Sequence, residues 1–153
     1  MLLWRLSGKP HARALDGGYG LLFDGRWNTV GHAVTYCATS PALCVLEKLV
    51  HVEDPALLPE LAMVTYEVPN AVSIEDVPLS ALAADWRRQE AWSQGKGDDW
   101  HAGRSTLLLR VPSVIVPFAN SPDCNVLVNH SHPGVADVRI VGLEEFSLDP
   151  RLF

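Results

Sequence analysis

Three side chains of different chemistry stand near one another in the first third of the chain: Arg26, Tyr36 and Glu47. Arg26 follows Gly25 on a glycine-rich segment, and a planar guanidinium binds phosphate oxygens through parallel hydrogen bonds. Glu47 interrupts an apolar run, where a carboxylate stabilises positive charge that grows during a reaction. Tyr36 offers a flat ring for stacking. Together these groups suit a nucleotide that becomes more positive as it reacts.

Each of these residues also has a purely structural interpretation. Glu47 can pair with His51 one helical turn further on, and Arg26 can pair with an aspartate of its own loop. Tyrosine rings are more often buried in the core than exposed to a ligand, which gives Tyr36 the same alternative. Spacing alone does not choose between the two interpretations.

The elements that position these groups follow from local patterns. Residues 3–6 read as a strand, residues 7–31 as a long polar loop, and residues 34–37 as a short β-branched and aromatic strand. Ser40 and Pro41 suit the start of a helix, because serine accepts from free first-turn amides and proline tolerates the first helical position. Apolar residues at helical spacing extend this helix to about His51 and place Glu47 at the edge of the buried stripe.

The rest of the chain alternates further strands with one more helix. We predict strands at residues 61–68, 106–111, 114–116, 125–128 and 138–141, a helix at residues 79–88, and a loop at residues 89–103. No repeat or linker interrupts this order. The sequence therefore predicts a single α+β domain over residues 1–153.

Composition narrows the classes of function. The formal net charge of −6, with twelve scattered Lys and Arg residues, argues against direct binding of nucleic acid. No apolar run approaches the roughly 20 residues that span a bilayer, so no membrane role is expected. Three cysteines are too few and odd in number for a disulfide framework, which favours the reducing cytoplasm.

Motifs along nearly the whole chain resemble the RES domain family, the toxins of bacterial Xre-RES toxin–antitoxin pairs. The similarity rests on order and spacing more than on any single motif. One departure is clear: His130 stands where the family usually has proline. The segments that carry the resemblance are Trp4-Arg5, Gly25-Arg26-Trp27-Asn28, Tyr36, Ser40, Glu47, Val111-Pro112-Ser113, Asn125-Val126-Leu127-Val128-Asn129 and Asp149-Pro150-Arg151-Leu152.

This resemblance implies a fold similar to the ADP-ribosyltransferases, with two small β-sheets framing a cleft, and an activity that consumes NAD as substrate without a prosthetic cofactor. Water, phosphate and a protein side chain all remain open as acceptors of ADP-ribose. The implied partner is an Xre-family helix-turn-helix antitoxin, and a homodimer stays open. The implied catalytic residues are Glu47, Arg26, Tyr36 and Ser113, and the implied NAD-binding residues are Arg5, Gly25, Arg26, Trp27, Asn28, Tyr36 and Asn125.

In this scheme Arg26 holds the pyrophosphate of NAD, with Arg5 as a second cation. Tyr36 and Ser113 position the nicotinamide riboside. Glu47 stabilises the cation that forms on the ribose when the bond to nicotinamide breaks.

Three other interpretations compete with this one. Cys124, His130 and His132 are of the residue types that bind zinc. A structural zinc site needs four ligands at characteristic spacing, so no metal is expected. The same histidines also suit a metal-independent ribonuclease, in which one imidazole accepts a proton and another donates one. A non-catalytic module that binds an Xre-type antitoxin is the third alternative.

Overall fold

The computed structural model describes residues 1–153, which form one seven-stranded sheet with three α-helices. The strand order is β4-β5-β6-β2-β1-β3-β7, and every pair is antiparallel except β4 with β5. The strands are β1 (Leu2–Gly8), β2 (Val34–Ala38), β3 (Leu61–Glu67), β4 (Ile74–Asp76), β5 (Leu108–Pro112), β6 (Cys124–Asn129) and β7 (Arg139–Phe146). The helices are α1 (Gly18–Leu22), α2 (Pro41–Leu49) and α3 (Glu90–Gly103).

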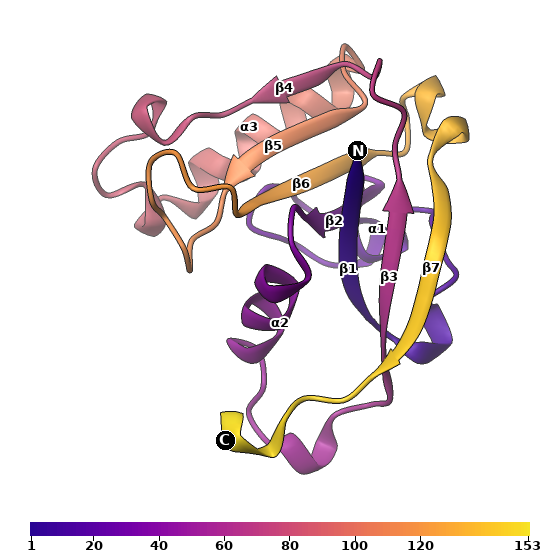
Figure 1. Ribbon diagram of the computed structural model, residues 1–153. Coiled ribbons are helices and arrows are strands. Elements are labelled where there is room, and N and C mark those ends of the chain that lie inside the picture. The colour runs from indigo at the N-terminus through magenta and orange to yellow at the C-terminus, as the bar shows by residue number, and fades with distance from the viewer.

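The sheet consists of two halves with a narrow joint. β1 pairs with β3 along its whole length but meets β2 only where Trp4 lies opposite Ala38. The half formed by β1, β3 and β7 therefore turns away from the half formed by β4, β5, β6 and β2, as Figure 1 shows. The predicted α+β fold is confirmed, and the two small sheets expected from the resemblance are the halves of one continuous sheet.

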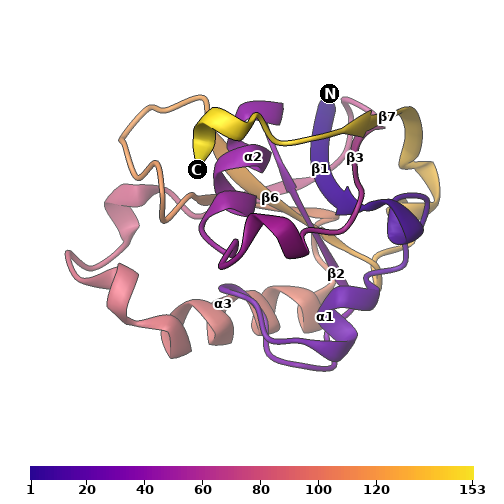
Figure 2. The same ribbon diagram turned by 90° about the horizontal axis from the view of Figure 1, so that it is seen from below.

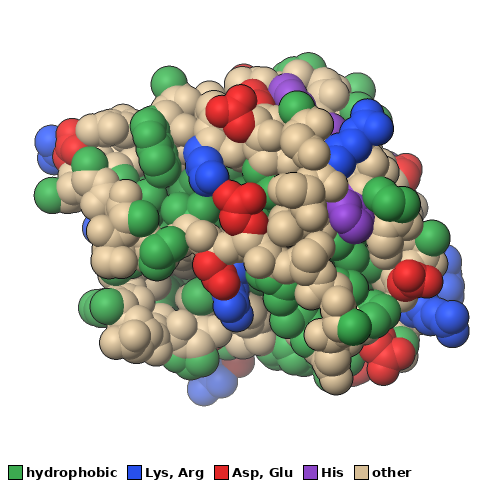
Figure 3. Space-filling model, turned by 90° about the horizontal axis from the view of Figure 1, so that it is seen from above, with side chains coloured by type: hydrophobic (Ala, Val, Ile, Leu, Met, Phe, Trp, Pro, Cys, Tyr) green, Lys and Arg blue, Asp and Glu red, His purple; other side chains and the backbone are tan.

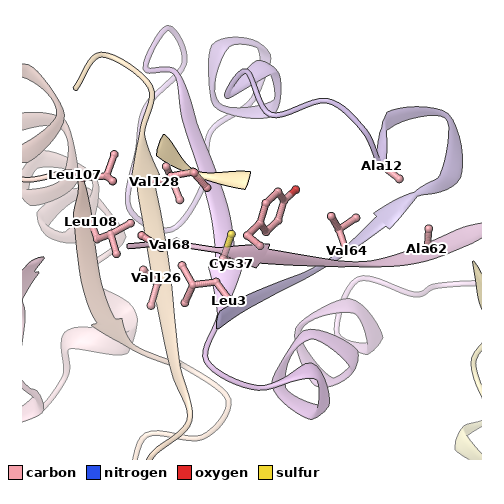
Figure 4. Packing of buried hydrophobic residues seen from close by; sticks show 12 residues of the cluster. Leu3, Ala12, Cys37, Ala62, Val64, Val68, Leu107, Leu108, Val126 and Val128 are labelled. Carbon is pink, nitrogen blue, oxygen red and sulfur yellow. The ribbon is translucent and has the colours of Figure 1, made fainter. Parts of the chain in front are cut away.

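The turn between the halves encloses the larger core. Alternate residues of both halves point into it, because successive side chains of a strand face opposite sides of a sheet. Val64 and Tyr66 of β3 belong to the same cluster as Val126 and Val128 of β6. Figure 4 shows these apolar side chains meeting between the strands.

The opposite face of the sheet is covered by α2 and α3. Leu43 of α2 packs with Ala38 of β2, while Trp100 of α3 packs with Leu109 and Leu127. Helix α3 thus covers the half that contains β5 and β6, while α2 lies over the joint between β1 and β2. Figure 2 shows the loop after α1 lying against α3, with α2 apart from both.

Helix α2 begins as its sequence predicts. Ser40 caps it by accepting from the amide of Leu43 at 3.2 Å, and Pro41 occupies the first helical position. The Ser40 hydroxyl also donates to Asp123 at 2.6 Å, which ties the start of the helix to the segment before β6.

The predicted helix and the predicted loop that follows it are reversed in the structure. Residues 79–88 form two short 3-10 turns (Leu79–Ala81 and Trp86–Arg88) instead of a helix, and most of the predicted loop at 89–103 is α3. One of the glycines that suggested a loop, Gly97, serves packing. A Cβ on Gly97 would lie 1.7 Å from the Trp27 carbonyl oxygen, so glycine lets the helix and that loop touch.

The remaining differences are smaller. Residues 114–116 are not a strand, because the Ser113 hydroxyl accepts from the amides of Ile115 at 3.0 Å and Val116 at 3.2 Å and bends the chain. Strand β4 and helix α1 are additional elements that the sequence patterns did not predict. None of the helices has the length and apolar character needed to cross a bilayer.

Candidate active site

Glu47 is half-buried on α2. Its carboxylate is held by two side chains, one directly after β5 and one on β6. Oε1 accepts from the Ser113 hydroxyl at 2.9 Å and from the Asn125 amide at 2.7 Å. No side chain or backbone group donates to Oε2. The carboxylate is therefore fixed through one oxygen and has the other available, and it does not pair with His51.

The hydrogen bonds of Ser113 define the direction of its proton. The side chain is fully buried, and its oxygen accepts from two backbone amides, which leaves the single O–H to donate to Glu47. Ser113 thus orients the carboxylate. Its burial leaves no surface for direct contact with a ribose or an amide, which differs from the role expected from the sequence.

The glycine-rich loop is closed around the hydroxyl of Tyr36. This hydroxyl accepts from the Trp27 amide at 2.9 Å and donates to Asn28 Oδ1 at 2.7 Å. A Cβ on Gly25 would lie 2.5 Å from the same hydroxyl, so only glycine fits there. Burial, the largest cause, raises the pKa of Tyr36 well above its ordinary value, and the phenol stays neutral.

Trp27 and Asn28 shape this loop from within. Each side chain is 1% exposed. The Trp27 ring packs among Trp86 and Trp92, and the Asn28 amide donates to carbonyls of the same segment. Their side chains therefore have no surface for a ligand, and a contribution to NAD binding is left to the backbone.

Arg26 projects from the loop toward the turn before α3. Its guanidinium lies 5.3 Å from the centre of the Trp86 ring and donates from Nη2 to the Trp86 carbonyl at 2.6 Å. Nε is buried and has no partner. Nη1 makes no hydrogen bond and is not buried, so this end of the half-buried guanidinium remains able to bind an anion.

Strand register brings these groups to one face of the sheet. Tyr36 lies two residues from Ala38 on β2, and Ala38 is paired with Asn125 of β6. Alternate residues face the same side, so the Tyr36 ring and the Asn125 amide lie on the face covered by α2 and α3. Through Asn125 this face also holds Glu47, and through the loop it holds Arg26.

Arg5 is not part of this group. It faces the opposite side of the sheet, where its guanidinium lies 5.7 Å from the centre of the Tyr66 ring. Nη2 donates to the carbonyls of His11 and Ala14, both at 3.0 Å, and so fixes the turn after β1. The structure gives this cation a local structural role away from the other predicted residues.

The side chains that suggested other functions are used locally. His130 Nε2 lies 2.8 Å from the Thr35 hydroxyl, and His132 Nδ1 accepts from the Gly134 amide at 3.0 Å. No group of three or more His, Cys, Asp or Glu residues is placed to hold a metal ion. Two open hollows of about 570 and 350 Å³ lie elsewhere, beside Phe146 and beside Asn70.

The sequence did not predict that side chains of α3 hold the glycine-rich loop in place. Asp98 accepts from the Thr29 amide at 2.9 Å and hydroxyl at 2.6 Å, and Ser93 donates to the Arg26 carbonyl at 2.7 Å. Gln94 donates to the Gly25 carbonyl at 3.1 Å. Because residues 89–103 were predicted to be a loop, the four-residue spacing of Gln94 and Asp98, which places them on one helix face, went unused.

Comparison with known proteins agrees with the geometry. The model of the RES domain family matches residues 2–149. Toxin Res of Pseudomonas putida is 38% identical over an alignment of 155 positions that covers 100% of both chains. The Prs ADP-ribosylating toxin of a Sphingobium species is 34% identical over 156 positions, covering 97% of this chain and 94% of that one.

A solved structure shares the fold. The MbcT-MbcA toxin–antitoxin complex of M. tuberculosis contains a chain that superposes with a TM-score of 0.67 at 16% identity, covering 95% of this chain and 84% of that chain. Fold, full-length relatives and family model agree. The chain belongs to the RES domain family of toxins, and this prediction is confirmed.

Proposed function

We propose that this RES toxin is an enzyme that cleaves the bond between nicotinamide and ribose in NAD. The observation that carries the proposal is the Glu47 carboxylate, whose Oε1 is held by Ser113 and Asn125 while Oε2 accepts no hydrogen bond. A fixed negative charge of this kind stabilises an oxocarbenium-like ribose without having to reorganise during the reaction. The Sphingobium relative, an ADP-ribosylating toxin, supports the same substrate.

The remaining residues are assigned to binding. Arg26 holds the pyrophosphate, since its half-buried guanidinium is stacked on Trp86 and its Nη1 makes no hydrogen bond. Tyr36 forms the floor beneath the nicotinamide riboside, and its neutral hydroxyl keeps the loop closed. Ser113 and Asn125 orient Glu47. The acceptor of ADP-ribose is water, phosphate or a protein side chain, and the three give different products.

Charge at the reacting carbon sets the expected effect of Glu47→Gln. A carboxylate ~4 Å from a unit positive charge stabilises it by about 4 kcal/mol at an effective dielectric of about 20, which corresponds to roughly a thousandfold in rate. Glutamine keeps an oxygen that accepts from Ser113 and Asn125, so the fold should be retained. We expect kcat for NAD consumption to fall by about a thousandfold, with a small change in thermal stability.

The experiment incubates the purified protein with NAD, with and without phosphate, and analyses small molecules and protein by mass spectrometry. Free ADP-ribose indicates hydrolysis, a phosphorylated ADP-ribose indicates phosphorolysis, and a mass increase of the protein indicates transfer. Glu60→Gln, on a carboxylate that pairs with Lys9 far from the site, is the matched control. Equal activity of Glu47→Gln and the wild type would refute the proposal.

We also propose an Xre-type antitoxin as the partner, with both proteins in the cytoplasm. The solved structure that shares this fold is a toxin–antitoxin complex. The net charge of −6 leaves DNA binding to the partner, and Figure 3 shows acidic and basic side chains interspersed on the face in view. Three free cysteines suit a reducing compartment. Co-purification with the product of the adjacent gene, followed by an NAD assay of the complex, tests the partner.

A further inference from the structure

Two aromatic rings lie exposed side by side at α1, Tyr19 within the helix and Phe23 directly after its last residue. Tyr19 is 60% and Phe23 54% exposed, and their ring centres are 5.1 Å apart at an interplanar angle of 35°. Single exposed apolar residues need no explanation, but adjacent exposed rings form a surface on which another flat ring can stack. Nothing in the fold requires this pair, because neither ring belongs to the buried clusters.

This aromatic pair adjoins the glycine-rich loop. The Asn28 amide donates to the Phe23 carbonyl at 3.2 Å, and its oxygen accepts from Tyr36 at 2.7 Å, so one side chain separates Phe23 from Tyr36. Tyr19 lies close as well. The Asn28 amide also donates to the carbonyl of Gly20, the residue after Tyr19, at 3.4 Å.

The order of contacts across the site resembles the order of groups in a dinucleotide. Glu47 contacts Asn125, which is paired with Ala38 two residues from Tyr36, and Tyr36 in turn contacts Asn28. The aromatic pair lies beyond Asn28, at the end of this series away from Glu47. If Glu47 marks the glycosidic bond and the loop of Arg26 marks the pyrophosphate, the next group of NAD is the adenosine.

We propose that Tyr19 and Phe23 form the adenine-binding part of the site, stacking on the purine ring of NAD. The inference rests on the proposed function and adds the residues that select a dinucleotide over a mononucleotide. Stacking suits this end of the substrate because it needs no buried hydrogen-bond partner and tolerates exposure to water. The pair contacts substrate but takes no part in bond cleavage.

The test compares two ligands that share a phosphate but differ in the base. ADP-ribose carries adenine, and nicotinamide mononucleotide does not. In Phe23→Ala we expect the affinity for ADP-ribose, measured by calorimetric titration, to fall about tenfold, as for loss of one aromatic stacking partner. Affinity for nicotinamide mononucleotide should stay unchanged. In steady state, KM for NAD should rise by a similar factor while kcat stays within twofold.

Matched variants separate stacking from general disturbance of α1. Leu22 is 70% exposed on the same helix, and Leu22→Ala should change neither affinity. Phe23→Tyr should restore ADP-ribose binding because it restores the ring, whereas Phe23→Leu should not. The Asn28 hydrogen bond goes to the Phe23 carbonyl, so it survives every one of these substitutions.

Every outcome of these binding and kinetic measurements either supports or overturns the inference. Unchanged ADP-ribose affinity in both Phe23→Ala and Tyr19→Ala overturns it, and so does an equal loss for both ligands or a fall in kcat. An equal effect of Leu22→Ala overturns it as well. Absence of NAD consumption by the wild type is a separate result that refutes the proposed function, on which this inference rests.

Discussion

At the scale of single residues, Glu47 shows how a carboxylate is held in one orientation without a cation beside it. Neutral donors, the Ser113 hydroxyl and the Asn125 amide, both bond to Oε1. They hold the side chain in place without cancelling its charge, as a lysine or arginine partner would. The negative charge therefore stays available to a cationic sugar at Oε2.

Asn125→Ala tests this positioning role. Ser113 would remain to hold Glu47, but one bond of a charged acceptor is lost, a change of about 1.5–3 kcal/mol for such bonds. We expect kcat to fall about ten- to a hundredfold with KM nearly unchanged, since binding groups are untouched. Asn70→Ala, which removes a contact to the terminal amine, is the control. A rise in KM with unchanged kcat would assign Asn125 to binding instead.

At the scale of elements, α3 decides where the glycine-rich loop, the proposed NAD-binding segment, lies. Ser93, Gln94 and Asp98 all bond to residues 25–29, and Gly97 lets the helix touch the Trp27 backbone. A helix with glycine at three positions has low intrinsic stability, so tertiary contacts must stabilise it. The helix and the loop thus order each other.

Two glycines of α3 provide a matched test of this account. Alanine favours a helix over glycine by about 1 kcal/mol. Gly95 has nothing within 4 Å of its ideal Cβ, so Gly95→Ala should raise the free energy of unfolding by up to about 1 kcal/mol. Gly97→Ala should lower it by about 1–3 kcal/mol, because the new methyl group would meet the Trp27 backbone. Urea denaturation measures both, and equal effects would contradict the packing role.

The same elements show what sequence can and cannot predict. Helix α2 was predictable because Ser40, Pro41 and the apolar stripe all agree locally. Helix α3 was not, since its three glycines indicate a loop and the need for Gly97 comes only from the Trp27 backbone, far away in sequence. At the site, chemistry suggested Glu47 and Arg26, and the resemblance to the RES family favoured functional over structural roles for them. Two features of the site depend on strand register, which no local pattern specifies. They are the buried hydrogen bonds of Ser113 and the position of Arg5 on the side of the sheet away from Glu47.

At the scale of the whole molecule, Glu47 links two parts that the sheet joins only weakly. The halves meet at the single pair of Trp4 and Ala38, and α2 packs over this joint, against Trp4 and Leu6 of β1 and Ala38 of β2. Hydrogen bonds then tie α2 to the half that contains β5 and β6. They run from Ser113 and Asn125 to Glu47 and from Ser40 to Asp123. The Glu47 carboxylate, proposed as catalytic, is therefore also a contact between halves, which is why Gln is a better test at position 47 than Ala.

Stability of the whole fold should depend on pH through His130, which stands where the family usually has proline. Burial, the largest cause, lowers its pKa to about 4, while in the unfolded chain it titrates near its ordinary value of about 6.5. Above pH 6.5 the imidazole is neutral in both states and has no effect. As pH falls from 6.5 toward 4, the unfolded state binds a proton that the folded state does not, so folding loses stability.

His130→Gln should remove this dependence. We expect the free energy of unfolding of the wild type to lose about 2 kcal/mol through this group between the two pKa values, a figure reduced for partial exposure. The variant should lose correspondingly less, whatever its stability at neutral pH. His101, whose pKa burial also lowers, leaves a residual slope in both proteins. Urea denaturation across pH 4–7 measures how the free energy of unfolding changes with pH, and His11→Gln, at an exposed histidine, is the control. Parallel curves of this free energy against pH for His130→Gln and wild type would show that His130 is protonated in the folded protein.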